Sequence, residues 1–249
     1  MFKGFYNLTS AMLSQGKRLD VISNNMANVA TSGYKADTYT DTTFREYVVS
    51  RVGNKDKRNP AEIGPASYIL APSRLYTDYT QGALEETGMP LDFALRGDGF
   101  FAVRSGGETA YTRAGNFALD GEGYLCLADG SRVLDSNGEE LFLGTDKIRA
   151  DASGAIYTED GGFLGRLGVY SFADNNQLQR SPQGYFTGAG AQAADETAVL
   201  WKTQERANVD LIGQMTGMIT SQRAFQSAAE VSKMYDELMT KAATNLGNV

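Results

Sequence analysis

The stretch SNNMANVATSGYK, residues 23–35, decides how this chain is organised, because it separates two kinds of sequence. Asparagine favours helix ends and turns, since its amide competes for backbone hydrogen bonds. Asn24, Asn25 and Asn28, followed by Thr-Ser-Gly, therefore predict the end of a helix. Gly33 can take the left-handed conformation that helix ends often use. The sequence predicts a helix before this stretch and a different structure after it.

Residues 8–29, which run into this stretch, have the apolar spacing of a coiled-coil helix. Apolar side chains recur mostly at steps of three or four, with Gln15 filling the one gap of seven. The row consists of Leu8, Met12, Leu19, Ile22, Met26 and Val29. A stripe this narrow needs a partner surface to cover it.

The C-terminal end of the chain predicts a second long helix. Residues 210–246 contain no proline, Asn208 can cap their first turn, and Asp210 places negative charge there. The apolar row consists of Leu211, Met215, Met218 and Phe225 and, after a shift of one residue, Val231, Tyr235 and Leu238. The two terminal helices could cover each other as a coiled coil, or each could pack on the middle of the chain.

The middle of the chain has the pattern of an antiparallel β domain. Short runs rich in aromatic and aliphatic residues, such as GFFAVR, TAYTRA, YLCLAD and LGVYSF, predict strands. Between them lie Asp120-Gly121, Asp129-Gly130, Asn137-Gly138 and Asp160-Gly161, which are strong hairpin signals. RVGNKDKRNPAEIGP, residues 51–65, predicts an exposed loop.

Together these patterns predict an α+β fold in which the N- and C-terminal helices pair as a coiled-coil stalk and an antiparallel β domain is inserted between them. Residues 1–40 and 205–249 form the helical part, residues 41–80 a linker or extended loop region, and residues 81–204 the β domain.

The composition excludes several classes of site. The chain has 249 residues, no histidine and one cysteine, Cys126, so zinc sites, Ser-His-Asp triads and Cys-His pairs lack their residues. Residues 59–196 carry twenty acidic against nine basic side chains, which argues against nucleic-acid binding. No apolar run is long enough to span a membrane, and the N-terminus lacks the pattern of a signal peptide. Taken alone, these features predict a cytoplasmic protein.

The acidic residues suggest two kinds of chemistry, and neither has a specific motif. Residues 118–140 are rich in calcium-ligand types but lack an EF-hand loop, so turn chemistry explains them better. The pairs Glu85-Glu86 and Glu139-Glu140 could act as glycosidase carboxylates, yet any acidic chain of this length offers such pairs. We expect no cofactor, no metal and no small-molecule substrate.

Three segments resemble the bacterial flagellar axial proteins, the rod and hook family. GMPLDFALRGDGFFAVR and YTRAGNFALDGEGYL, in the middle of the chain, are similar to the family's core, and residues 208–239 are similar to its C-terminal helix. The N-terminal signature is matched by Asn24, Asn25, Met26, Ala27, Asn28, Val29, Thr31, Gly33, Tyr34 and Lys35. The matches occur in the family's order and cover most of the chain.

The resemblance implies a structural role without catalysis. It implies a basal-body rod subunit of the proximal or distal class that assembles into a hollow helical shaft and transmits motor torque. The expected partners are copies of itself, neighbouring rod and hook proteins, and the flagellar type III export apparatus. The expected location is the basal body in the cell envelope, reached without a cleaved signal peptide.

The resemblance also assigns roles to the two sets of residues. Asn24, Asn25, Ala27, Asn28, Thr31, Gly33 and Tyr34 become an assembly motif, and the two apolar rows become subunit interfaces. We expect Gly33→Val to impair assembly more than folding of the β domain. The alternatives to a rod subunit are a short hook-type or other axial protein, a cell-wall hydrolase, and a soluble binding module.

Overall fold

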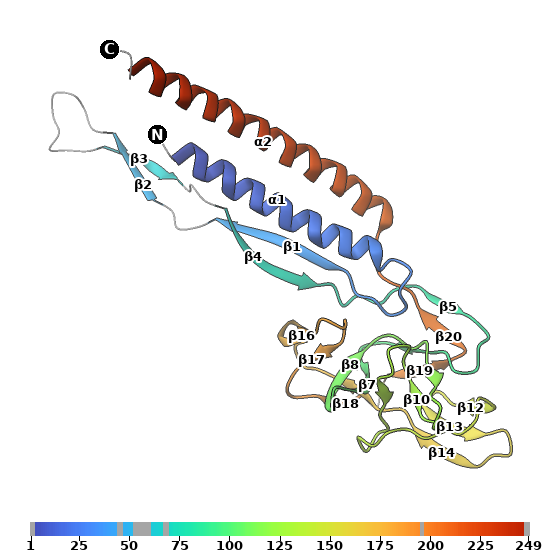
Figure 1. Ribbon diagram of the computed structural model, residues 1–249. Helices are drawn as coiled ribbons and strands as arrows, with labels where there is room; N and C mark the ends of the chain where they lie inside the picture. Colours follow the sequence, from blue (N-terminus) through green and yellow to red (C-terminus); the bar gives the residue numbers. More distant parts are fainter. Residues whose placement is uncertain (1–2, 44–46, 52–60, 67–69, 195–196, 247–249) are drawn as a thin grey trace. The chain divides into compact units, whose positions relative to one another are not determined.

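The structure is a computed structural model that describes residues 3–43, 47–51, 61–66, 70–194 and 197–246 (Figure 1). It has an N-terminal helix, a C-terminal helix and many short antiparallel strands between them, so the predicted α+β class is confirmed. The chain forms two compact units. Unit 1 consists of residues 1–26, 37–76 and 210–249, and unit 2 of residues 27–36 and 77–209.

Unit 1 contains the two long helices and two pairs of strands. The helices are α1, Lys3–Ala27, and α2, Leu211–Leu246. The strand pairs are β1, Asp37–Thr43, with β4, Leu70–Thr77, and β2, Tyr47–Arg51, with β3, Ala61–Ala66. The region 41–80, expected as a linker or extended loop, thus contributes strands to the helical unit. Of the loop expected at 51–65, residues 52–60 lie outside the described residues.

Helix α1 contacts both β1 and α2 within unit 1 (Figure 1). On one side, Ser14 Oγ donates to Asp41 Oδ1 at 2.6 Å, and Arg18 forms an ion pair with Asp41 at 3.1 Å. On the other side, a Cβ placed on Gly217 of α2 would lie 3.4 Å from Ile22 Cδ1, which is ordinary van der Waals contact.

Unit 2 is built almost entirely of short antiparallel strands. Its main sheet has nine strands, seven of which follow the path β16-β17-β8-β7-β11-β10-β9. Of the other two, β15 pairs with β7, and β18 pairs with β15. A three-stranded sheet and the pairs β19-β6 and β20-β5 complete it. The bounds of the main-sheet strands are β7 Phe100–Ser105, β8 Glu108–Thr112, β9 Ala118–Leu119, β10 Leu125–Cys126, β11 Arg132–Val133, β15 Val169–Ser171, β16 Gln179–Arg180, β17 Phe186–Thr187 and β18 Gln192–Ala193. The others are β5 Leu84–Glu86, β6 Phe93–Arg96, β12 Ile148–Ala150, β13 Ala155–Thr158, β14 Phe163–Arg166, β19 Ala198–Trp201 and β20 Thr203–Glu205, and η1 Asn175–Gln177 is a short 3-10 helix.

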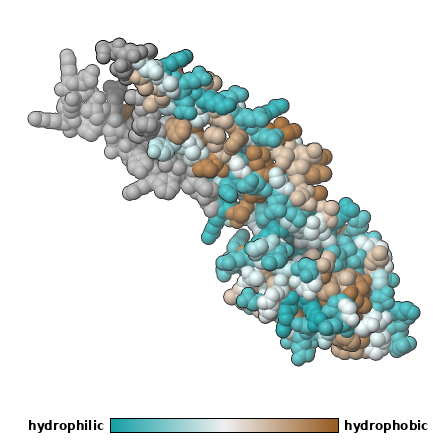
Figure 2. All heavy atoms as spheres, viewed as in Figure 1, coloured by the Kyte–Doolittle hydropathy of each residue, from teal (hydrophilic) through white to brown (hydrophobic). Residues whose placement is uncertain are grey.

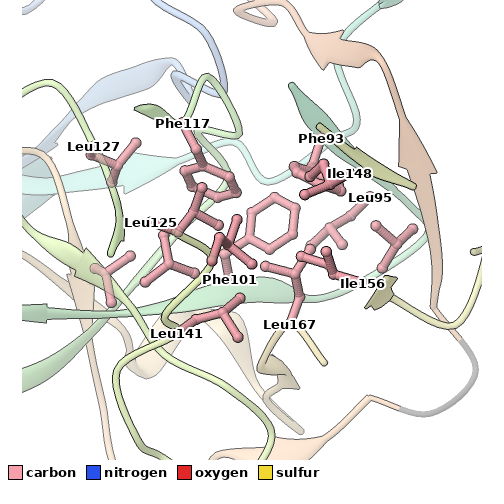
Figure 3. Close-up of a cluster of buried hydrophobic side chains, with 14 of the residues drawn as sticks. Phe93, Leu95, Phe101, Phe117, Leu125, Leu127, Leu141, Ile148, Ile156 and Leu167 are labelled. Atoms are coloured by element: carbon pink, nitrogen blue, oxygen red, sulfur yellow. The ribbon is translucent and has the colours of Figure 1, made fainter. Parts of the chain in front are cut away.

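Strand β7 divides the core of unit 2 into two clusters, because successive side chains of a strand point to opposite faces. Phe101 and Val103 lie in the larger cluster, which Figure 3 shows, whereas Phe100 and Ala102 lie in the smaller one. In the larger cluster the rings of Phe101 and Phe117 meet edge to face at 5.2 Å. Both faces of β7 are therefore buried, which explains why GFFAVR reads as a continuous apolar run.

Three turns of unit 2 share one arrangement. The Oδ1 atoms of Asp120, Asp135 and Asp151 each accept the backbone N–H groups two and four residues later, at 2.8 to 3.0 Å. A glycine three residues after each Asp has positive φ. At the first turn this glycine is Gly123, and Gly121 of the predicted Asp-Gly pair is not in the left-handed region. The predicted turn chemistry is confirmed, with the aspartate side chains holding the turns.

We expect Asp151 to make unit 2 less stable in acid. The Ser153 hydroxyl and the backbone N–H groups of Ser153 and Ala155 lower the pKa of Asp151, although partial burial opposes them. A carboxylate whose pKa is lowered on folding stabilises the fold above its unfolded pKa of about 3.9, and this contribution is lost as pH falls through the folded value. Asp151→Asn should therefore give a smaller fall in the free energy of unfolding below about pH 4.

Chemical denaturation followed by Trp201 fluorescence would measure this slope, since Trp201 is the single tryptophan. Glu108→Gln, at an exposed strand end, controls for the loss of one negative charge. If Asp151→Asn and wild type lost stability equally in acid, the Asp151 turn would not be the source of the acid sensitivity of unit 2.

Candidate functional site

The predicted assembly residues fall into two groups, which correspond to the two units. In unit 1, Asn24 is exposed and Asn25 is buried on α1, whose last residue, the exposed Ala27, already belongs to unit 2. In unit 2, Asn28 is half-buried and Thr31 exposed, whereas Gly33 and Tyr34 are buried. The predicted signature is thus shared between the end of α1 and a segment that packs with the strands.

The predicted apolar rows are covered to different degrees. On α1, Ile22 is buried and the remaining helical members, Leu8, Met12, Leu19 and Met26, are half-buried, as is Val29 beyond the helix end. On α2, Met218, Phe225 and Tyr235 are half-buried, whereas Leu211, Met215, Val231 and Leu238 are exposed. The role of these rows as subunit interfaces stays a prediction.

The row of α2 that is covered within unit 1 differs from the predicted one. It steps by four and three residues and includes Gln214, Met218, Ser221, Phe225, Ala228, Ser232, Tyr235 and Met239. Several members are polar, and Ser221 is buried. Apolar periodicity could not find this row, because small polar side chains occupy some of its positions.

Asn25 shows why asparagines are found at this helix end. Its side-chain amide donates to the carbonyl of Asp37 at 2.7 Å and accepts the N–H of the same residue at 3.0 Å. The amide therefore binds both the backbone N–H and the backbone carbonyl of Asp37, the residue at which β1 begins. Asn28 acts locally, since its Oδ1 accepts the Thr31 hydroxyl at 3.2 Å. Asn25 thus ties the last turn of α1 to the start of β1.

Gly33 has the predicted left-handed conformation, with φ 68°, but it is not the residue that ends the helix. Its N–H donates to the Glu205 carbonyl at 2.7 Å. A Cβ at Gly33 would lie 2.2 Å from the Arg113 carbonyl carbon and 2.3 Å from the Ala114 nitrogen. Gly33 is therefore in close contact with the backbone of unit 2, and this geometry does not support the expectation that Gly33→Val would largely spare the β domain.

The side chains around Gly33 form a buried ion cluster, here called the Glu205 cluster: Lys35, Arg113 and Glu205. All three are at most 3% exposed. Lys35 Nζ lies 2.6 Å from Glu205 Oε1, and Arg113 NH1 lies 3.2 Å from Glu205 Oε2. Glu205 Oε1 also accepts the Gly82 N–H at 2.9 Å. One carboxylate thus links the N-terminal signature, the central strands and the last strand before α2.

The electrostatics of the cluster depend on Glu205. Burial lowers the pKa of Lys35, while the charge of Glu205 and its hydrogen bond raise it, and the charge of Arg113 lowers it further. Two further donors bind carbonyls, since Lys35 donates to Thr80 O at 2.7 Å and Arg113 to Gly97 O at 2.7 Å, whereas Arg113 Nε is buried without a hydrogen-bond partner among the described residues. Two buried cations share one buried anion, so removal of that anion would leave both without compensation.

Neighbouring contacts fix the rest of the segment. Arg180 lies over the Tyr34 ring at 4.3 Å and donates to the Lys35 carbonyl at 3.1 Å. Asn208 Oδ1 accepts the Ala36 N–H at 2.7 Å, and its amide donates to Asp78 O at 2.8 Å. The prediction that Asn208 caps the C-terminal helix is wrong.

The residue that precedes the first helical position of α2 is Asp210, whose carbonyl accepts the Gln214 N–H at 2.9 Å. Asp210 therefore takes the capping position, and its charge lies at the helix N-terminus as predicted.

Several of the acidic residues considered for catalysis or calcium form ion pairs with arginines. Arg132 forms ion pairs with Asp120, Glu122 and Glu140, and its guanidinium lies 4.2 Å from the centre of the Tyr124 ring. Within the described part of the chain, no group of three or more acidic or cysteine side chains could hold a metal ion. In the Glu205 cluster, both cations pair with the one carboxylate.

Family models match this chain at both ends and in the middle. The model described as flagella basal body rod protein matches residues 5–35, the FlgE/F/G D1 domain model of flagellar hook proteins matches residues 94–167, and the C-terminal model of flagellar basal body rod FlgEFG proteins matches residues 202–246. The flagellar basal-body rod protein FlgG of Bacillus subtilis is 32% identical over 96% of this chain and 97% of its own length. The chain belongs to the flagellar rod and hook protein family.

Other members of the rod and hook family match to different extents. The flagellar basal-body rod protein FlgF of Mesorhizobium japonicum is 28% identical over the whole chain and 99% of its own length. The flagellar hook protein FlgE of Treponema pallidum is 36% identical, but over 53% of the chain and 29% of its own length. The N- and C-terminal family matches contain Gly33, Lys35 and Glu205, so the Glu205 cluster joins two segments by which the family is recognised. None of the helices in the described ranges is both long and apolar enough to cross a membrane.

Proposed function

We propose that this protein is a structural subunit of the flagellar basal-body rod. The observation that carries the proposal is the match to rod proteins over nearly the full length of both chains. A hook subunit is a weaker candidate, since the hook protein matched is covered over less than a third of its length. We propose no catalytic activity, because the relatives are named as rod proteins and, of the carboxylates considered for catalysis, Glu140 pairs with Arg132 and Glu85 with Arg206.

The terminal helices would form a coiled-coil stalk at the inner layer of a hollow shaft. This arrangement is supported by the four-three spacing of the covered row on α2 and by the approach of Ile22 to Gly217. In addition, Asn25 Nδ2 lies 3.5 Å from Gln214 Oε1. Copies of the chain would stack by a head-to-tail contact that does not close, which builds a helical filament suited to transmitting torque.

The neighbours of the subunit would be further rod and hook proteins. The flagellar type III apparatus would export the chain, and the assembled rod would lie in the basal body within the cell envelope. The shared segments at both ends of the chain support assembly with other axial proteins, since the matching family models cover rod and hook proteins alike.

The helices would gain their full stability only on assembly. Ordering a residue costs about 1–2 kcal/mol, and burial of an apolar side chain returns about 1.5–3 kcal/mol. On α2, Ile212, Met215 and Leu238 remain at least half exposed in the single chain. Much of their apolar surface would therefore be buried only by a neighbouring subunit.

Amide hydrogen exchange on the isolated and the assembled protein tests the proposal. In the isolated subunit we expect weak protection at residues 8–26 and 211–246, and strong protection at the N–H of Gly33, which is bonded inside unit 2. Assembly into rods should protect both helices. Strong protection of both helices in a subunit that stays monomeric would contradict the proposal.

A further inference from the structure

Unit 1 contains an open groove between helix α1 and the strands β1 and β4. Its volume is about 420 Å³. Val21, Tyr39 and Leu75 provide apolar surface, and Leu75 is 60% exposed. The charged groups Lys17, Asp20, Asp37 and Arg74 also line it, so the rim carries both signs of charge. The groove could accept an apolar segment flanked by polar side chains.

Helix α2 carries an apolar surface that unit 1 leaves uncovered. The α2 patch consists of Ile212, Met215 and Ile219, whose exposed fractions are 77%, 51% and 52%. They occupy positions i, i+3 and i+7 and therefore share one side of the helix. Figure 2 shows apolar residues, in brown, interrupting the polar surface along the helices. Residues at this spacing are the anchors by which an amphipathic helix binds a groove.

We propose that the α2 patch of one copy of this chain fills the α1–β1–β4 groove of a second copy. The charges favour this occupant: Asp210 and Arg223 are exposed on either side of the patch, and the groove offers Arg74 for the first and Asp20, which pairs with Lys17 at 3.7 Å, for the second. The proposal rests on the proposed rod function, and it assigns the two surfaces that meet.

The assignment also gives the contact its open-ended geometry. Groove and patch consist of different residues, so a copy that inserts its patch into a neighbour keeps its own groove free for a third copy. Such a heterologous contact extends into a filament if its rotation does not close a ring. Two patches packed against each other would instead give a closed dimer.

Cross-linking between single-cysteine forms tests the contact. Leu75→Cys and Met215→Cys are each placed in the full-length chain with Cys126→Ala, and the two forms, carrying different epitope tags, are co-expressed in cells that lack the wild-type chain. After mild oxidation of isolated basal bodies we expect a covalent dimer that contains both tags. Because a disulfide needs Cβ atoms within about 4.5 Å, this dimer reports direct contact.

Ala224→Cys is the matched control, since it is exposed on α2 nine residues from Met215 and therefore on the opposite side of the helix. The Leu75–Met215 pair should give at least about tenfold more mixed dimer than the Leu75–Ala224 pair, as expected for groups held in contact. Equal yields, or dimers of Met215→Cys alone, would overturn the groove assignment. If basal bodies contain both forms and no mixed dimer appears, this inference fails and the rod function stands. If the cells produce the two cysteine forms but basal bodies contain neither of them, and the wild-type chain is absent from basal bodies as well, then this inference and the rod function both fail.

Discussion

Glu205→Ala should destabilise unit 2 by about 3–5 kcal/mol, the range for removal of one partner from a buried ion pair. The substitution leaves Lys35 and Arg113 buried without a counter-charge and removes the acceptor of the Gly82 N–H. Glu205→Gln keeps the size and one acceptor but loses the charge, so we expect a loss of stability between those of wild type and Glu205→Ala. Chemical denaturation followed by Trp201 fluorescence measures the free energy of unfolding.

Glu85→Ala provides the control, because Glu85 forms an ion pair with Arg206 in which both side chains are more than half exposed. An exposed pair contributes at most about 1 kcal/mol. If Glu205→Ala and Glu85→Ala had the same effect, the Glu205 cluster would not be what holds the N-terminal signature to the strands. Replacing Lys35, Arg113 and Glu205 together by apolar residues should be less damaging than Glu205→Ala, since no uncompensated charge remains.

Gly33→Ala should release residues 31–36 from their packing in unit 2. An alanine there has both a left-handed φ, which costs about 1–2 kcal/mol, and a Cβ that overlaps the backbone at Arg113 and Ala114. Backbone atoms cannot rotate away, so the segment must move. The slow exchange expected at the N–H of residue 33 should be lost, and unit 2 should lose about 2 kcal/mol or more beyond the cost of φ alone.

Gly88→Ala separates the two causes. Gly88 has φ 73°, nearly the same as Gly33, yet a Cβ there would meet no atom within 4 Å. Its substitution should therefore show the cost of the backbone conformation alone. Equal losses in the free energy of unfolding for Gly33→Ala and Gly88→Ala would mean that the close approach of Gly33 to Arg113 does not contribute to the cost of the substitution.

The sequence predicts the elements of this protein well because each has a local cause. The aromatic run at Phe100 and Phe101 predicts a strand, and the apolar spacing predicts both helices. The covered side of α2 is different, since Ser221 and Ser232 lie on it and are polar. Periodicity of apolar residues detects long hydrophobic side chains, and it cannot detect a covered side that includes small polar ones.

The Glu205 cluster could not be predicted from the sequence for a different reason. Lys35 lies 170 residues before Glu205, and Arg113 lies 92 residues before it. Nothing in the local sequence of a charged residue indicates that it is buried. The one signal was Lys35 itself, which closes the N-terminal signature, and its partners required the structure.

Basal bodies isolated from the bacterium that encodes this chain provide the most direct test of its role. Mass spectrometry and electron microscopy of these particles, compared between wild type and a strain lacking the chain, would locate it. We predict that the chain is a component of the axial rod and that the rod of the deletion strain is missing or truncated. A complete rod in that strain, with the chain absent from wild-type basal bodies, would contradict its assignment as a rod subunit.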